Sequence, residues 1–375
     1  MDKKLTDICK IQYGYAFDSA KFSDSEGIPL VRIRDVVRGF SETYTTEECG
    51  AEYVVHNGDM LIGMDGEFNI SQWKGGKAYL NQRVCRLIPT DEVDALYLFY
   101  FMPKALKAIE DKTPFVTVKH LSARELNKVV VPIPEMEEQK KIASSLQKVD
   151  KLISLRKEQL AKLDELVKSR FIELFGDPVQ NSFKWDTKPL LEMGYCKNGM
   201  NFHTGDSGIE MHCLGVGDFK DYSVIDGTDH LPTISLNEEP TEESMLQNGD
   251  IVFVRSNGNK ALVGRCLVVY PHDTPTTYSG FCIRYRLTSS DVDTAYLLRV
   301  LKTDSMRKKM AGRGANIQNL NQQILASLDI PIPPREIQEQ FTAFVKQTDK
   351  SRLVIQQSLH KLELLKKSLM QQYFS

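Results

Sequence analysis

The chain has 375 residues, a hydrophobic share of 41%, a charged share of 26% and a net charge of −2. This length predicts two or three domains, and the composition is that of an ordinary water-soluble protein. No apolar run is long enough for a membrane span, and the first ten residues lack the apolar segment of a signal peptide. The seven cysteines form no Cys-x-x-Cys pair, which disfavours disulfides or a zinc site and predicts reduced thiols in the cytoplasm.

Residues 1–134 predict a first module of mixed α and β structure, here called module 1. Asn57–Asp59 has the sequence of a tight turn between strands, and residues 94–110 predict a helix with a kink at Pro103. Strands are expected at residues 30–34, 60–63, 84–88 and 129–131.

Residues 135–176 predict one long helix. Pro132 and Pro134 end the preceding strand and stand just before the helix, where proline is tolerated. Acidic residues fill the first turn, where the helix dipole favours negative charge. About 40 residues, each rising 1.5 Å, give a helix roughly 60 Å long.

Residues 177–334 repeat the plan of the first module, and we call them module 2. Asn248–Asp250 matches the turn at Asn57–Asp59, and residues 292–297 match residues 93–98. Gly14 and Gly199 occupy equivalent places in two further matching segments. Between these anchors the sequences diverge, which predicts one scaffold carrying two different surfaces.

Residues 335–375 predict a second long helix, which aligns without a gap with the first. Pro331, Pro333 and Gln338 repeat Pro132, Pro134 and Gln139. Apolar residues recur at alternating steps of three and four, a pattern typical of a coiled coil. The residues expected between the two helices are Leu146, Val149, Ile153, Leu160, Leu163, Val167, Val345, Ile355, Leu359, Leu362 and Leu369. The alternative is two unrelated amphipathic helices, each packed on its own domain.

Catalytic motifs are missing from the sequence. Gly75–Ala78 lacks the upstream glycine and the Ser/Thr of a phosphate-binding loop, and the histidines have no metal-binding spacing. The chain also has no Asn/Asp-Pro-Pro-aromatic tetrapeptide, which an amino-methyltransferase would need. These observations favour a binding protein over an enzyme.

Nucleic-acid features are local. Module 1 has 17 basic and 19 acidic side chains and module 2 has 15 and 19, so DNA binding would need local basic patches or a partner that contacts phosphates. Loops at equivalent places in both modules carry Arg, Asn and Gln, the side chains that bind guanine and adenine edges. The candidate DNA-binding residues are Arg32, Arg34, Asn69, Lys74, Lys77, Arg83, Thr117, Lys119, His120, Arg255, Asn257, Asn259, Lys260, Arg313, Asn316, Gln318 and Asn319.

Two divergent modules, each followed by a Pro-x-Pro segment and a long helix with Gln139 or Gln338, resemble the specificity (S) subunit of type I restriction–modification systems. The resemblance covers the whole chain. The loop before Leu121 departs from it, because Thr113-Pro114 stands where the second loop has Gly312-Arg313. The implied fold is α+β, with two similar target recognition domains separated by two long antiparallel helices in a pseudo-twofold repeat. The implied domains are residues 1–134, 135–176, 177–334 and 335–375.

The resemblance implies a non-catalytic subunit that binds a bipartite, asymmetric sequence in double-stranded DNA. The helix pair would set the spacer and dock two methyltransferase subunits. Those partners would hold S-adenosylmethionine and methylate adenine N6, while this chain would hold no cofactor and no metal. Restriction and translocase subunits would complete the complex.

Other classes stay open at this point. A coiled-coil adaptor that binds no DNA would explain the near-neutral charge. The detached specificity half of a fused restriction–methylation enzyme would look the same from this chain. An enzyme with unrecognised motifs is the third alternative.

Overall fold

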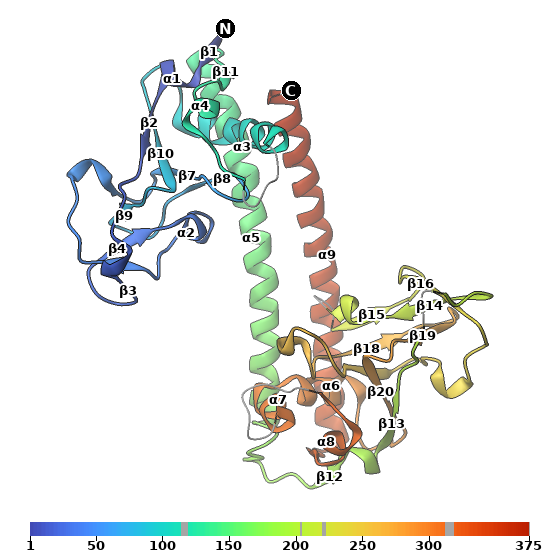
Figure 1. Ribbon diagram of the computed structural model, residues 1–375. Helices are drawn as coiled ribbons and strands as arrows, with labels where there is room; N and C mark the ends of the chain where they lie inside the picture. The colour runs from blue at the N-terminus through green and yellow to red at the C-terminus, as the bar shows by residue number, and fades with distance from the viewer. Residues whose placement is uncertain (114–118, 203–204, 220–222, 312–318, 375) are drawn as a thin grey trace. The chain divides into compact units, whose positions relative to one another are not determined.

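The computed structural model describes residues 1–113, 119–202, 205–219, 223–311 and 319–374 (Figure 1). The chain forms two compact units. Unit 1 comprises Met1–Glu158 and Gln356–Ser375, and unit 2 comprises Gln159–Ile355. Each unit therefore contains one module and half of each long helix. The predicted domain boundaries, which separate the helices from the modules, stay a prediction.

Unit 1 is built on small antiparallel and mixed sheets. The first pairs β1 (Asp2–Lys4) with β11 (Val130–Pro132). The second has the order β2 (Cys9–Tyr13), β10 (Val84–Pro89), β7 (Met60–Gly63) and β8 (Asn69–Gln72), with antiparallel neighbours. The third has the order β3 (Phe22–Ser23), β5 (Tyr44–Thr45), β4 (Ile28–Val31), β9 (Ala78–Leu80) and β6 (Val54–Val55). The helices of module 1 are α1 (Leu5–Ile8), α2 (Ile33–Arg38), α3 (Ala95–Lys112) and α4 (Ala123–Leu126).

Unit 2 repeats the central part of this plan. Strands β12 (Thr187–Pro189) and β21 (Asp329–Pro331) pair as β1 and β11 do. The main sheet has the order β13 (Gly194–Asn198), β20 (Cys282–Leu287), β17 (Asp250–Val254), β18 (Cys266–Tyr270) and β15 (Val224–Asp226). A further sheet has the order β16 (Thr233–Leu236), β14 (Ile209–Leu214) and β19 (Thr276–Tyr278). The helices of module 2 are α6 (Thr294–Lys302), α7 (Asp304–Ala311) and α8 (Gln322–Ala326).

The two Asn-Gly-Asp turns enter equivalent strands, β7 and β17. Gly58 and Gly249 have φ angles of 94° and 90°, which glycine adopts without steric cost. The carboxylates of Asp59 and Asp250 accept the N–H groups at the start of each turn, from His56 at 2.9 Å and Gln247 at 2.7 Å. These observations explain why Gly and Asp recur at the second and third positions of both turns.

A buried glutamine joins module 1 to the first long helix. The side chain of Gln139 accepts the N–H of Asp94 at 2.9 Å and donates to the carbonyl of Pro134 at 2.9 Å. Asp94 is the N-cap of α3, so the glutamine ties the start of α5 to the start of α3. The Tyr97 hydroxyl adds a hydrogen bond to the carbonyl of Pro132 at 2.7 Å.

Unit 2 contains the same joint. Gln338 accepts the N–H of Asp293 at 2.7 Å and donates to the carbonyl of Pro333 at 2.9 Å. The Tyr296 hydroxyl donates to the carbonyl of Pro331 at 2.9 Å. The recurring prolines, glutamines and tyrosines therefore belong to a structural joint rather than to a binding surface.

The long helices are α5 (Met136–Phe175) and α9 (Arg335–Phe374), each of 40 residues, and they run antiparallel within each unit (Figure 1). In unit 1, Asp150 pairs with Lys366 at 2.6 Å and Lys157 pairs with Glu363 at 3.6 Å. In unit 2, Asp164 pairs with Arg352 at 2.7 Å. As the residue numbers rise along α5, those of the partners on α9 fall, which is the pairing of antiparallel helices. Of the residues expected between the helices, Leu146, Val149, Ile153, Val167 and Val345 are buried, and Leu160, Leu163, Ile355, Leu359, Leu362 and Leu369 are half-buried.

The predicted strand at residues 30–34 is wrong in its second half. Strand β4 ends at Val31, and Ile33–Arg38 forms helix α2. The fully buried carboxylate of Asp35 accepts the N–H of Arg32 at 2.9 Å and closes the first turn of this helix. This local capping outweighs the β preference of the Val and Ile residues.

Candidate nucleic-acid interface

Three segments of module 1 meet beyond the end of β7. The N–H of Met64 donates to the carbonyl of Arg83 at 3.1 Å, and the N–H of Leu121 donates to the carbonyl of Met64 at 2.7 Å. Arg83 directly precedes β10, and Leu121 follows the predicted recognition loop. We call this arrangement, with the adjoining Asp65 and His120, crossing 1.

Module 2 has the same backbone arrangement beyond the end of β17. The N–H of Arg255 donates to the carbonyl of Phe281 at 2.8 Å, and the N–H of Leu320 donates to the carbonyl of Arg255 at 2.8 Å. We call this arrangement, with the adjoining Ser256 and Asn319, crossing 2. The matching hydrogen bonds make Arg255 equivalent to Met64, and Phe281 equivalent to Arg83.

The shared glycines lie beside the two crossings. Gly14 follows β2, and a Cβ at this position would overlap the carbonyl group of Asn81. Gly199 follows β13, where a Cβ would overlap the carbonyl group of Ser279. Both glycines allow one strand end to approach the segment that leads into β10 or β20.

Crossing 1 carries a charged and polar cluster. The Nδ1 atom of His120 lies 2.5 Å from Asp65 Oδ1, and the Nε atom of Arg83 lies 3.7 Å from Asp65 Oδ2. The side chains of Arg83 and His120 are 53% and 46% exposed. A fixed backbone thus presents hydrogen-bond donors and an acceptor to solvent, the groups that recognise base edges.

Crossing 2 carries a different set. Arg255 is half-buried, and its Nη1 atom lies 3.4 Å from the carbonyl oxygen of Gly280. Asn319 is exposed, and Ser256 stands where crossing 1 has Asp65. Phe281 takes the place of Arg83 and is 61% exposed.

The other predicted residues of module 1 lie outside this cluster. Arg34 belongs to α2 and donates to Thr43 Oγ1 at 3.1 Å, while Lys119 donates to the carbonyl of Glu110 at 2.8 Å. The structure therefore joins Arg83 and His120 in one cluster, places Lys119 directly before His120, and leaves the remaining candidates on other elements. Those remaining are Arg32 and Arg34 at α2, Asn69 in β8, and the exposed Lys74 and Lys77 between β8 and β9.

The loop after β17 is shaped by its own asparagines. Asn257 Oδ1 accepts the N–H of Asn259 at 2.7 Å, and Asn259 Oδ1 accepts the N–H of Ala261 at 3.1 Å. Lys260 is exposed on the same loop. Thr117, Arg313, Asn316 and Gln318 lie outside the described residues.

Asp65 and Phe281 belong to the crossings but were not among the sequence candidates. An alignment of the strand that begins at Val84 with the strand that begins at Cys282 places Phe281 opposite Arg83. This alignment could have identified Phe281 from the sequence. A single phenylalanine in a sequence, however, usually indicates a core residue.

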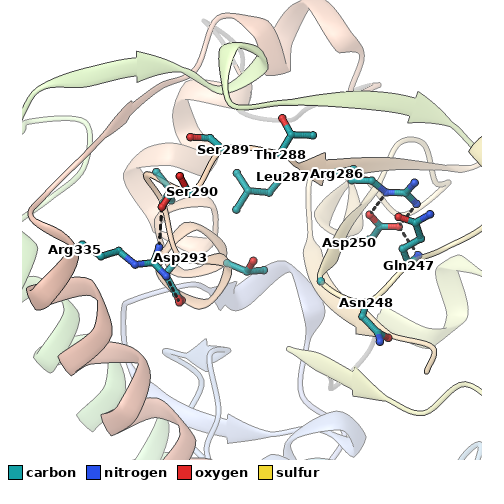
Figure 2. Close-up of a pocket in the computed structure, with 13 residues that line it drawn as sticks. Gln247, Asn248, Asp250, Arg286, Leu287, Thr288, Ser289, Ser290, Asp293 and Arg335 are labelled. Carbon is teal, nitrogen blue, oxygen red and sulfur yellow. Dashed lines mark hydrogen bonds and ion pairs between the residues drawn. The ribbon is translucent and has the colours of Figure 1, made fainter. Parts of the chain in front are cut away.

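A groove of about 420 Å³ lies at the other end of the main sheet of unit 2 (Figure 2). Asp250 binds Arg286 there at 2.8 Å, and Arg335 lies 3.7 Å from Asp293 and 3.2 Å from the carbonyl of Ser290. Figure 2 shows these charges directed at one another rather than into the groove. The Arg335–Asp293 pair connects α9 to module 2, whereas the Asp250–Arg286 pair lies within the main sheet.

The cysteines are free thiols, and several are buried. Burial raises the pKa of Cys9 and Cys266 to about 11 and that of Cys85 to about 12, so these thiols are poor nucleophiles at neutral pH. Within the described ranges, no cluster of three His, Cys, Asp or Glu residues could hold a metal ion. None of the described helices is long and apolar enough to cross a membrane.

The sequence matches the family model "Type I restriction modification DNA specificity domain" over residues 1–165 and 215–364. This match covers module 1, residues 215–334 of module 2 and most of both long helices. The chain belongs to this family. The resemblance seen in the sequence is thereby confirmed, and a family of DNA specificity domains supports the prediction of a recognition chain rather than an enzyme.

Curated relatives of this family member are specificity subunits. The type I restriction enzyme EcoBI specificity subunit of Escherichia coli is 36% identical over 166 residues, which are 44% of this chain and 35% of that protein. The MjaVIII specificity subunit of Methanocaldococcus jannaschii is 24% identical over 341 residues, which are 85% of this chain and 79% of that protein.

Solved structures of the family share the fold. The type I restriction–modification S subunit from M. genitalium matches with a TM-score of 0.60 at 13% identity, over 100% of this chain and 96% of that chain. A chain from a study of complex assembly in the type I system matches with a TM-score of 0.56 at 15% identity, over 100% and 97%. The predicted fold class is confirmed.

Proposed function

We propose that this family member is the sequence-reading subunit of a type I restriction–modification complex, with one module for each half of a bipartite, asymmetric DNA target. The observation that carries the proposal is the pair of crossings. They share their backbone hydrogen bonds but differ in their side chains, Arg83 and His120 against Phe281 and Asn319. Two matching backbones that carry different side chains suit two half-sites of different sequence.

The helix pair would dock two copies of a methyltransferase. Leu155 and Leu365 are exposed in unit 1, and Val354 and Leu166 are exposed at the repeat-equivalent positions in unit 2. Apolar residues on the outside of a helix pair favour protein contacts. Two equivalent pairs fit two copies of one partner.

The partners would supply the chemistry and part of the DNA affinity. Neither module is basic, so phosphate contacts by the methyltransferases would complement base contacts by this chain. The partners would hold S-adenosylmethionine, extrude the target adenine and methylate its N6 atom. Restriction and translocase subunits would join the same complex, which would act on DNA in the cytoplasm, with the helix pair setting the spacer.

The test is co-expression of this chain with its methyltransferase in a host that lacks adenine methylation, followed by sequencing for N6-methyladenine. We expect one split, asymmetric motif with modified adenines on both strands, and no modification when either protein is omitted. A soluble complex of the two proteins that leaves the DNA unmodified and unbound would favour the adaptor alternative.

A further inference from the structure

Phe281 is the most exposed phenylalanine among the described residues, at 61%. Its backbone is fixed, because its carbonyl accepts the N–H groups of Arg255 at 2.8 Å and Ser256 at 3.3 Å. Its own N–H donates to Ser279 Oγ at 3.3 Å. The next residue, Cys282, is fully buried, so the ring of Phe281 projects outward from a rigid strand end. A rigid aromatic group loses little entropy on binding.

Its place in the module suggests what this ring contacts. Phe281 occupies the position of Arg83, which lies in a cluster of donors and acceptors with Asp65 and His120. Such a cluster suits the major groove, where every base pair presents its own pattern of hydrogen-bonding groups. Because the two backbones match, Phe281 would enter the same groove in the second half-site.

We infer that Phe281 reads a thymine through its 5-methyl group in the half-site bound by module 2, an inference that rests on the function proposed above. A phenyl ring offers no hydrogen bond to a base edge. In the major groove, the group that it distinguishes by apolar contact is the thymine methyl. Insertion as a wedge between bases is the other use of such a ring, but it belongs to the minor groove and to kinked DNA.

The test compares thymine with deoxyuridine, which lacks only the methyl group, in the assembled complex with the methyltransferase. Each thymine of the second half-site is replaced in turn, and the initial methylation rate is measured with limiting complex. For the wild type we expect the initial methylation rate to fall about fourfold at one thymine, because burial of one methyl group contributes a factor of this size. Phe281→Ala should lower the methylation rate on the thymine substrate. With this variant, the substrates with thymine and with deoxyuridine at that position should be methylated at the same rate.

Controls separate the possible failures. Phe183→Ala removes another exposed phenylalanine of unit 2, 51% exposed, and should keep the full methyl effect. Phe281→Leu should keep part of it. The inference is overturned if Phe281→Ala retains the wild-type methyl effect, or if the wild type shows none. Failure of the wild-type complex to methylate a split motif would instead contradict the proposed function.

Discussion

At the scale of single residues, buried polar side chains explain most of what the two halves share. Gln139 and Gln338 each connect a proline carbonyl, an N-cap aspartate and the start of a long helix. A buried amide can replace the water it loses only with partners in fixed places. The residue types at these joints are therefore restricted, whereas the exposed residues of the crossings are free to differ between the two modules.

Gln338→Ala should lower the free energy of unfolding by about 1–3 kcal/mol, because it leaves a buried N–H and buried carbonyl groups without partners. Gln347→Ala, at an exposed position of the same helix, is the matched control and should change little. Denaturant unfolding of the full chain measures both. Equal midpoints for the two variants would contradict the structural role given to Gln338.

The buried thiols give the stability a pH dependence. Burial raises the pKa of Cys266 from 9.0 to about 11, so the folded state keeps a proton that the unfolded state loses above pH 9. Stability from this group is therefore complete below pH 9 and is lost as the pH rises to about 11. Between pH 8 and pH 10, the free energy of unfolding should fall by about 1 kcal/mol less in Cys266→Ala than in the wild type. Unfolding curves at both pH values check this, and an unchanged decline would contradict it.

At the scale of elements, the sequence predicts best where periodicity is long. The heptad pattern predicted helices over 135–176 and 335–375, and the structure has them at Met136–Phe175 and Arg335–Phe374. Short strands in module 1 were harder, and the segment after Val31 turned out helical because of capping by Asp35. Hydrophobic periodicity predicts a helix that buries a long face. It does not predict a short helix that is started by a single hydrogen bond.

Leu160→Asp should weaken the helix pair, because Leu160 is half-buried and belongs to the apolar stripe that the heptad pattern predicts between α5 and α9. We expect a loss of about 1–2 kcal/mol in unfolding free energy, roughly half the cost of truncating a fully buried leucine. Ala161→Asp places the same charge at an exposed neighbouring position and should be tolerated. A pair of variants with the same unfolding midpoint would argue against a helix pair held together by this apolar face.

At the scale of the whole molecule, the repeat of module and helix was readable from the sequence, but the candidate site was readable only in part. Arg83 and His120 were predicted, and the structure adds Asp65 between them and Phe281 at the equivalent place in module 2. These pairings depend on hydrogen bonds between segments far apart in the chain. No local pattern in the sequence records such pairings.

In the proposed function, each module recognises its own half of the DNA target. The most direct test is the N6-methyladenine motif produced by the complete complex with wild-type chain, with His120→Ala and with Asn319→Ala. Both replaced side chains are exposed, so folding should be retained. We expect His120→Ala to relax the base preference in one half of the motif and Asn319→Ala to relax it in the other half, with the spacer unchanged. Relaxation of the same half by both variants, or of neither half by either, would contradict it.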